Sequence, residues 1–148
     1  MRMNAKTILA VVILLGIVVI AGAMPDQPNM QAARGSLITA RNELVRATPD
    51  KGGHRANAIR LTNSAIAEVN AGIAFDRRHN HASSLTAETL FAGAPDQPHM
   101  HAALNALQNA RDSLNRADAD KGGHRVKALG LVNDAISEVQ KGIDAGRG

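Results

Sequence analysis

The chain has 148 residues, enough for one modest domain, and its 45% hydrophobic and 20% charged residues exclude a disordered chain and a polytopic membrane protein. It contains no Cys, Trp or Tyr, which excludes disulfides, thiolate metal sites, thiol catalysis and attached c-type haem, and leaves an aliphatic core. The net charge of +4 is too small to indicate a binder of nucleic acid.

Residues 1–23 have the three parts of a secretory signal. Arg2 and Lys6 form a short basic start, an apolar stretch follows, and residues 21–23 (Ala-Gly-Ala) have the small-x-small pattern that signal peptidase accepts. We therefore expect cleavage after residue 23 and a mature protein that is periplasmic or secreted. The alternative is an uncleaved anchor in the inner membrane with residues 24–148 facing outward, because the apolar stretch is 18 residues long.

The rest of the chain consists of two copies of one unit, 70 residues apart. Residues 25–77 match residues 95–147 at 29 of 53 positions without a gap. Such similarity predicts two units of the same fold, at 24–76 and 95–148, joined by a linker at 77–94.

Each unit contains two helical patterns in which apolar residues are spaced alternately by three and four. The first pattern comprises Met30, Ala33, Leu37, Ala40, Leu44 and Ala47, with Met100, Ala103, Leu107, Ala110, Leu114 and Ala117 in the second unit. The second comprises Ile59, Thr62, Ile66, Val69 and Ile73, with Leu129, Val132, Ile136, Val139 and Ile143. A short connector between the two patterns predicts an antiparallel helical hairpin.

One hairpin of this size cannot cover its own apolar seams. We therefore predict an all-α fold in which the two duplicated hairpins form a four-helix bundle, most simply up-down-up-down, preceded by the N-terminal apolar signal or anchor helix. A bundle formed between chains would use the same surfaces, which keeps a homo-oligomer open.

Three motifs in this order carry a resemblance: Pro-Asp-Gln-Pro-x-Met, Asp-Lys-Gly-Gly-His-Arg and Ala-Ile-x-Glu-Val-x-x-Gly-Ile. The chain resembles a set of small exported bacterial helical-hairpin proteins over nearly all of residues 25–147. The resemblance implies the hairpin architecture and no particular activity.

Histidines on both sides of the linker form the first candidate site. Its members are His79, His81, His99, Met100 and His101. If the second helix ends where the third begins, as in an up-down-up-down bundle, these side chains converge. Imidazole binds Cu and Zn, and a thioether selects Cu(I), so convergence predicts a Cu or Zn site. The alternative is a set of ordinary helix-end histidines, because Asn29 and Gln31 replace two of them in the first unit.

The second candidate is the motif Asp-Lys-Gly-Gly-His-Arg, which is identical in both units. Its members are Asp50, Lys51, Gly52, Gly53, His54 and Arg55, and Asp120, Lys121, Gly122, Gly123, His124 and Arg125. One interpretation is an anion site, because glycines at a helix start expose backbone N–H groups beside basic side chains. We favour a structural role, in which the aspartates cap the helices, the glycines permit a tight turn and the histidines contact the neighbouring connector.

Signatures of catalysis do not accompany these motifs. Glu68 and Glu138 are isolated acids rather than a pair with acid and base roles, and there is no nucleophile elbow. Haem ligation by Met30 with His79 or His81 is disfavoured, because a bundle cofactor needs space between inward-facing ligands and no aromatic residues flank the seam.

The sequence thus predicts a non-enzymatic helical bundle that acts outside the cytoplasm as a structural or interaction module, with a protein partner or a second copy of itself. One alternative is a periplasmic protein that binds Cu or Zn through the histidines near the linker. Another is a membrane-tethered accessory subunit of a larger complex. Nucleic acid is not an expected partner, and a membrane would be contacted only through an uncleaved leader.

Overall fold

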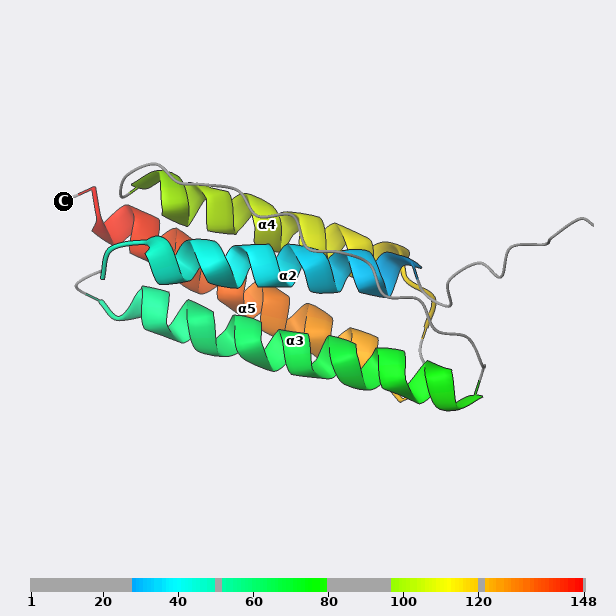
Figure 1. The fold of residues 1–148 in the computed structure, drawn as a ribbon. Coiled ribbons are helices and arrows are strands. Elements are labelled where there is room, and N and C mark those ends of the chain that lie inside the picture. Colours follow the sequence, from blue (N-terminus) through cyan, green and yellow to red (C-terminus); the bar gives the residue numbers. More distant parts are fainter. Residues whose placement is uncertain (1–27, 50–51, 80–96, 120–121, 148) are drawn as a thin grey trace, which may run out of the picture.

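The computed structural model describes residues 28–49, 52–79, 97–119 and 122–147. They form four α-helices, labelled as in Figure 1: α2 (Pro28–Arg46), α3 (His54–His79), α4 (Gln97–Arg116) and α5 (His124–Ala145). The predicted four-helix bundle is confirmed, and hairpin 1 (α2–α3) and hairpin 2 (α4–α5) are its two halves. None of these four helices combines the length and hydrophobicity that a bilayer span requires, and the predicted leader lies outside the described residues.

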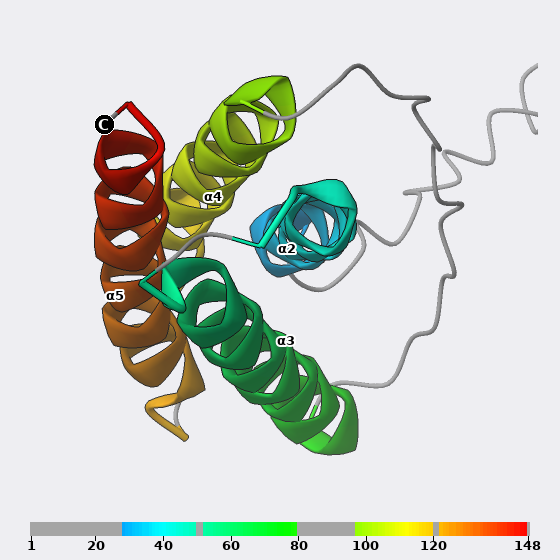
Figure 2. The ribbon, with the colours of Figure 1, turned by 90° about the vertical axis from the view of Figure 1, so that its left-hand side faces the viewer.

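The two hairpins face each other so that each helix packs against its own sequence equivalent, α2 on α4 and α3 on α5. These contacts are more extensive than those within each hairpin. Viewed from one end, the order around the bundle is α2, α3, α5, α4 (Figure 2). Equivalent helices are antiparallel: Asn29 at the start of α2 donates to the carbonyl of Arg116 at the end of α4, at 2.9 Å.

Helices α3 and α4 run in the same direction along the bundle (Figure 1). The helix directions are therefore up-down-down-up, and the prediction of up-down-up-down is wrong. The physical reason is that both arrangements bury the same seams, while only the observed one places each helix against its equivalent. The 17 residues from 80 to 96 suffice to join opposite ends, since α4, with 20 residues, is ~30 Å long and an extended 17-residue chain reaches about 56 Å.

The first predicted seam is confirmed in both hairpins, because all twelve of its members are buried. Leu37, Leu44 and their equivalents Leu107 and Leu114 are fully buried. Alanines alternate with these large side chains along α2 and α4. The small residues allow the two backbones to approach closely, and the leucines and methionines fill the spaces between them.

The core of α3 and α5 lies to one side of the predicted stripe. Ala58 and Ala65 are fully buried, whereas Ile59 and Ile66 are half-buried and pack at the edge of the core. Thr62 is fully buried, and its hydroxyl donates to the carbonyl of Ala58 at 2.7 Å. Small residues therefore occupy fully buried positions on this face of α3, and the larger isoleucines flank them.

Candidate functional site

The connector before α3 and its equivalent before α5 are built on paired glycines. The second glycine of each pair, Gly53 or Gly123, has φ +71°, a left-handed conformation that costs an L-residue with a side chain about 1–2 kcal/mol. Gly123 is also the N-cap residue of α5 and, having no side chain, makes no side-chain cap hydrogen bond. Asp50 and Asp120, the predicted caps, lie outside the described residues together with Lys51 and Lys121, so that part of the motif stays a prediction.

The first glycine of each pair makes room for the histidine that begins the next helix. A Cβ at Gly52 would lie 2.6 Å from both Cδ2 and Nε2 of His54, and a Cβ at Gly122 would lie 2.6 Å from Cδ2 and 2.9 Å from Nε2 of His124. These distances are well inside the optimal separation of non-bonded carbon atoms, about 3.5–4.0 Å. Each imidazole therefore lies with its Nε2 edge against its own connector, and any larger residue than glycine would displace it.

The Nδ1 edge of each ring reaches a helix of the other hairpin. His54 donates from Nδ1 to Oε2 of Glu138 at 2.9 Å, and His124 donates from Nδ1 to Oε2 of Glu68 at 2.8 Å. The two pairs are equivalent under the 70-residue repeat and lie at the two ends of the α3–α5 contact. The ring of Phe75 also lies against His124, with centroids 6.5 Å apart. The motif histidines thus join the two hairpins.

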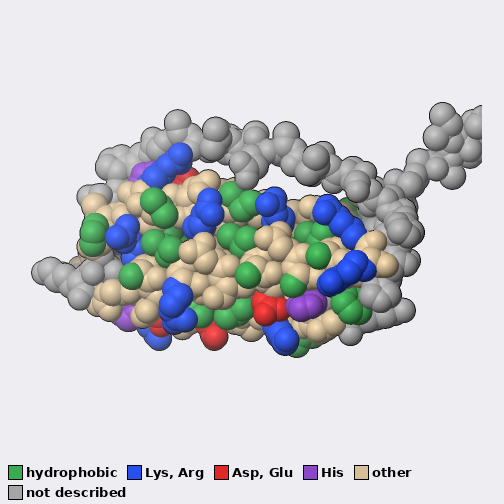
Figure 3. All heavy atoms as spheres, turned by 60° about the horizontal axis from the view of Figure 1, so that its bottom comes forward, with side chains coloured by type: hydrophobic (Ala, Val, Ile, Leu, Met, Phe, Trp, Pro, Cys, Tyr) green, Lys and Arg blue, Asp and Glu red, His purple; other side chains and the backbone are tan. Residues whose placement is uncertain are grey.

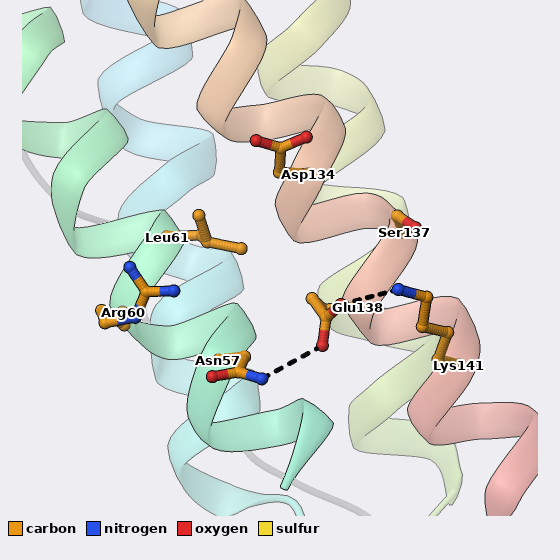
Figure 4. A pocket seen from close by; sticks show the side chains of 7 residues that line it. All are labelled: Asn57, Arg60, Leu61, Asp134, Ser137, Glu138 and Lys141. Atoms are coloured by element: carbon orange, nitrogen blue, oxygen red, sulfur yellow. Dashed lines mark hydrogen bonds and ion pairs between the residues drawn. The ribbon is translucent and has the colours of Figure 1, made fainter. Parts of the chain in front are cut away.

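Glu138 accepts hydrogen bonds from three side chains. Its Oε2 accepts hydrogen bonds from His54 and, at 3.4 Å, from Asn57, and its Oε1 accepts one from Lys141 at 2.9 Å. Figure 4 shows the hydrogen bonds from Asn57 and Lys141. The hydrogen bonds from His54 and Lys141 lower the pKa of Glu138 from 4.5 to about 2. Ala71 occupies the position of Lys141 in hairpin 1, so the surroundings of the two motif glutamates differ.

The arginine of the motif binds the end of the preceding helix. Nη1 of Arg55 donates to the carbonyls of Leu44, Val45 and Ala47 at 3.3, 3.4 and 2.9 Å. Arg125 makes the equivalent bond to the carbonyl of Leu114 at 3.3 Å. A cation at this point satisfies carbonyls that lack partners within the helix and complements the negative end of the helix dipole.

A third histidine–glutamate pair joins α2 and α4. His99 donates from Nδ1 to Oε2 of Glu43 at 2.6 Å, and Glu43 also accepts from Arg46 at 3.1 Å through Oε1. The side chains of His99 and Glu43 are only 12% and 11% exposed, so this pair is more buried than the two between α3 and α5. It has no equivalent elsewhere, because the corresponding residues are Asn29 and Ser113.

The predicted convergence of the histidines near the linker is wrong. His79 ends α3 at one end of the bundle, and α4 begins with His99, Met100 and His101 at the opposite end (Figure 1). His99 pairs with Glu43, Met100 is buried in the core and His101 is exposed. Within the described ranges, no three His, Asp or Glu side chains are grouped so that they could hold a metal ion. His81 lies outside those ranges.

A hollow of about 290 Å³ lies between α3 and α5 beside Glu138 (Figure 4). Its lining residues are Asn57, Arg60, Leu61, Asp134, Ser137, Glu138 and Lys141. Only Leu61 among them is apolar, and most of the others are exposed. The hollow is therefore a polar depression in the surface rather than an enclosed apolar pocket of the kind that holds most small molecules.

Sequence reasoning treated Glu68 and Glu138 as isolated acids and did not single out Glu43. One signal for Glu43 was present. His99 and Glu43 are both replaced in the other unit, by Asn29 and Ser113, so the two members of the pair differ together between the repeats. For the glutamates of α3 and α5 no such signal exists, because both units carry the same residues.

No family model, curated protein or solved structure matches this chain. The chemistry of the site is therefore interpreted from its own geometry. Within the part of the chain that the structure describes, that geometry comprises three histidine–glutamate pairs, all between hairpins.

Proposed function

We propose that this protein is an exported, non-enzymatic helical bundle that serves as a structural or interaction module outside the cytoplasm. The observation that carries the proposal is how the shared Gly-Gly-His-Arg motif is used. Its first glycine makes room for the imidazole, its second makes the turn, its histidine joins the hairpins and its arginine caps the preceding helix. These residues recur in both units because each hairpin needs them to pack.

The orientation of the imidazoles supports a structural role over acid–base catalysis. In a catalytic histidine whose Nδ1 is held by a carboxylate, Nε2 must lie within hydrogen-bond reach of a nucleophile or substrate. Here Nε2 of His54 and of His124 lies over a connector glycine instead. Glu138, with its pKa lowered to about 2, is a weak base at neutral pH.

The surface favours polar contacts with a partner. Figure 3 shows Lys and Arg side chains spread over one face, with hydrophobic side chains in small separate groups between them. Among the described residues, the large hydrophobic side chains that are most exposed are Val45 and Val126, one on α2 and one on α5. A partner protein, or a second copy of the chain, would therefore meet a mixed polar and basic surface rather than an apolar groove.

The location outside the cytoplasm is proposed from the leader. Residues 1–23 combine a basic start, an apolar stretch and a small-residue cleavage site. The resemblance to small exported helical-hairpin proteins agrees with this destination. Whether the leader is removed decides between a soluble module and a membrane-tethered subunit.

Fractionation of the native host, followed by intact and native mass spectrometry, tests the proposal. We expect a chain that starts at Met24 in the fraction outside the cytoplasm, and the native mass then reports its assembly. The matched control replaces Arg2 and Lys6 with Glu, which should hold the chain in the cytoplasm. Wild-type protein found only in the cytoplasm would contradict the proposed location.

A second measurement tests the proposal that the protein is not an enzyme. Purified wild-type chain is assayed on ester, amide and phosphate-ester substrates beside the variants His54→Asn and His124→Asn. We expect no turnover above the uncatalysed rate for any of the three proteins. Turnover by the wild type that either variant loses, while circular dichroism still reports a folded bundle, would overturn the non-enzymatic assignment.

A further inference from the structure

The α2–α4 seam has two ends that would be equivalent if the hairpins were identical. Residues 70 apart occupy matching places, and the aliphatic members of the seam are the same in both helices. At one end His99 meets Glu43. At the other end Asn29 and Ser113 stand in their places, and Asn29 donates to the carbonyl of Arg116. The histidine–glutamate pair is therefore present at only one end of this seam.

This difference matters because each hairpin presents nearly the same surface to its partner. A second copy of hairpin 1 could lie on hairpin 1 through the same methionines, alanines and leucines. The pairs between α3 and α5 would also form, since both units carry the same histidine and glutamate. Most of the interface would thus also fit two copies of the same hairpin, one from each of two chains, and such a pairing would link the chains into a dimer.

The pair between α2 and α4 distinguishes these combinations. When hairpin 1 meets hairpin 2, Glu43 faces His99. When hairpin 1 meets a second hairpin 1, Glu43 would face Asn29 at both ends, and two nearly buried carboxylates would lose their imidazole partner. When hairpin 2 meets hairpin 2, His99 would face Ser113 at both ends. Neither combination of like hairpins contains the ion pair.

We propose that His99 and Glu43 determine which hairpin pairs with which, so that the chain closes on itself instead of joining a second copy through like hairpins. The pair acts as a specificity contact: it favours the correct partner, and in the wrong one the nearly buried Glu43 carboxylate loses its imidazole and keeps only Arg46 of its own helix. Buried charge pairs across interfaces commonly change an association constant by roughly tenfold or more.

The proposal predicts that exchanging one residue between the hairpins reverses the preference. In the full chain, Asn29→His together with His99→Asn leaves composition and net charge unchanged. Hairpin 1 then carries both members of the pair, so two copies of hairpin 1 gain two ion pairs, whereas the contact between hairpins 1 and 2 loses its only one at this seam. We expect the dimer dissociation constant to fall by roughly a hundredfold, measured by sedimentation equilibrium.

A compensating variant serves as the matched control. Adding Glu43→Ser and Ser113→Glu to the exchange rebuilds the pair at the other end, between hairpins 1 and 2. We expect this fourfold variant to behave as the wild type in sedimentation. If the twofold exchange fails to fold, recovery in the fourfold variant still supports the proposal, and no recovery overturns it.

A thiol reports which hairpins are in contact, because the natural chain has no Cys. Seven residues toward the middle of the seam from Glu43 and His99 lie Ser36 and Ala106, so a like pairing of hairpin 1 would bring two Ser36 side chains together. Ser36→Cys should form a disulfide-linked dimer in the twofold exchange and not in the wild-type background. Thr39→Cys, on a partly exposed face of α2, should form none in either.

Three further results would overturn the proposal. One is a twofold exchange that associates as weakly as the wild type. Another is an exchange that is destabilised but stays monomeric, which would make the pair a stabilising contact without a role in partner choice. The last is a Ser36→Cys disulfide dimer in the wild-type background, which would show that like hairpins already meet.

Discussion

The two seams between the hairpins differ in how they use charge. The α3–α5 seam has a histidine–glutamate pair at each end, and the four side chains are between 17% and 29% exposed. The α2–α4 seam has one such pair, at a single end, with both side chains at 12% exposure or less. A contact that occurs twice serves both hairpins alike. A contact that occurs once can distinguish one hairpin from the other.

The largest effect should come from the aliphatic middle of the α2–α4 seam, where the two hairpins are alike. Leu37→Ala and Leu107→Ala each remove a fully buried side chain, at an expected cost of about 2–5 kcal/mol in the free energy of unfolding. The two costs should agree within about 0.5 kcal/mol, because the positions are equivalent. Urea unfolding followed by circular dichroism measures both. Unequal costs would show that the symmetry of the seam is only apparent.

An intermediate effect should separate the two kinds of pair. Glu43→Ala leaves the imidazole of His99 nearly buried without an acceptor, which should cost about 2 kcal/mol. Glu68→Ala breaks a more exposed pair and should cost about 1 kcal/mol or less. Ser113→Ala, at the position equivalent to Glu43, is the control and should change stability least. If Glu68→Ala costs as much as Glu43→Ala, burial does not distinguish the two seams.

The smallest effect should appear as a dependence on pH at one end of the α3–α5 seam. The pKa of Glu138 falls from 4.5 to about 2 on folding, through its hydrogen bonds with His54 and then Lys141. Its contribution to stability is therefore present above pH 4.5 and is lost as the pH falls from 4.5 through about 2.

Thermal melts of the wild type and of Glu138→Gln check this dependence. The difference in melting temperature should be largest above about pH 5 and should vanish near about pH 2. Lys141→Ala removes one of the two main donors and raises the folded-state pKa of Glu138, so the loss should be smaller and should be complete at a higher pH. A difference that does not vary with pH would contradict the assigned role of the carboxylate.

The spacing of apolar residues along the chain predicted the helices and the seam between α2 and α4. The seven-residue spacing from Met30 to Ala47 predicted which side of α2 is buried, and the same spacing predicted it for α4. The second seam was predicted less accurately. Periodicity identified the apolar side of α3, but the close approach of α5 decided that Ala58 and Ala65, rather than Ile59 and Ile66, lie at its centre.

The sequence pattern also predicted where the connectors lie, whereas the contacts made by their side chains came from the structure. The paired glycines indicated a turn before α3 and α5. That the first glycine accommodates an imidazole, and that the arginine reaches back to the carbonyls of the preceding helix, depends on contacts between residues that the sequence does not relate.

The sequence by itself determined four amphipathic helices, the duplicated hairpin and the aliphatic character of the core, because each depends on spacing and composition within a short stretch. Only the tertiary structure decided which helix covers which seam. An apolar stripe specifies that it must be covered, and nearly identical stripes in both units leave several partners equally suitable. The choice of α4 for α2 separated His79 from His99 by the length of the bundle. It also brought His99 to Glu43, 56 residues away in the chain.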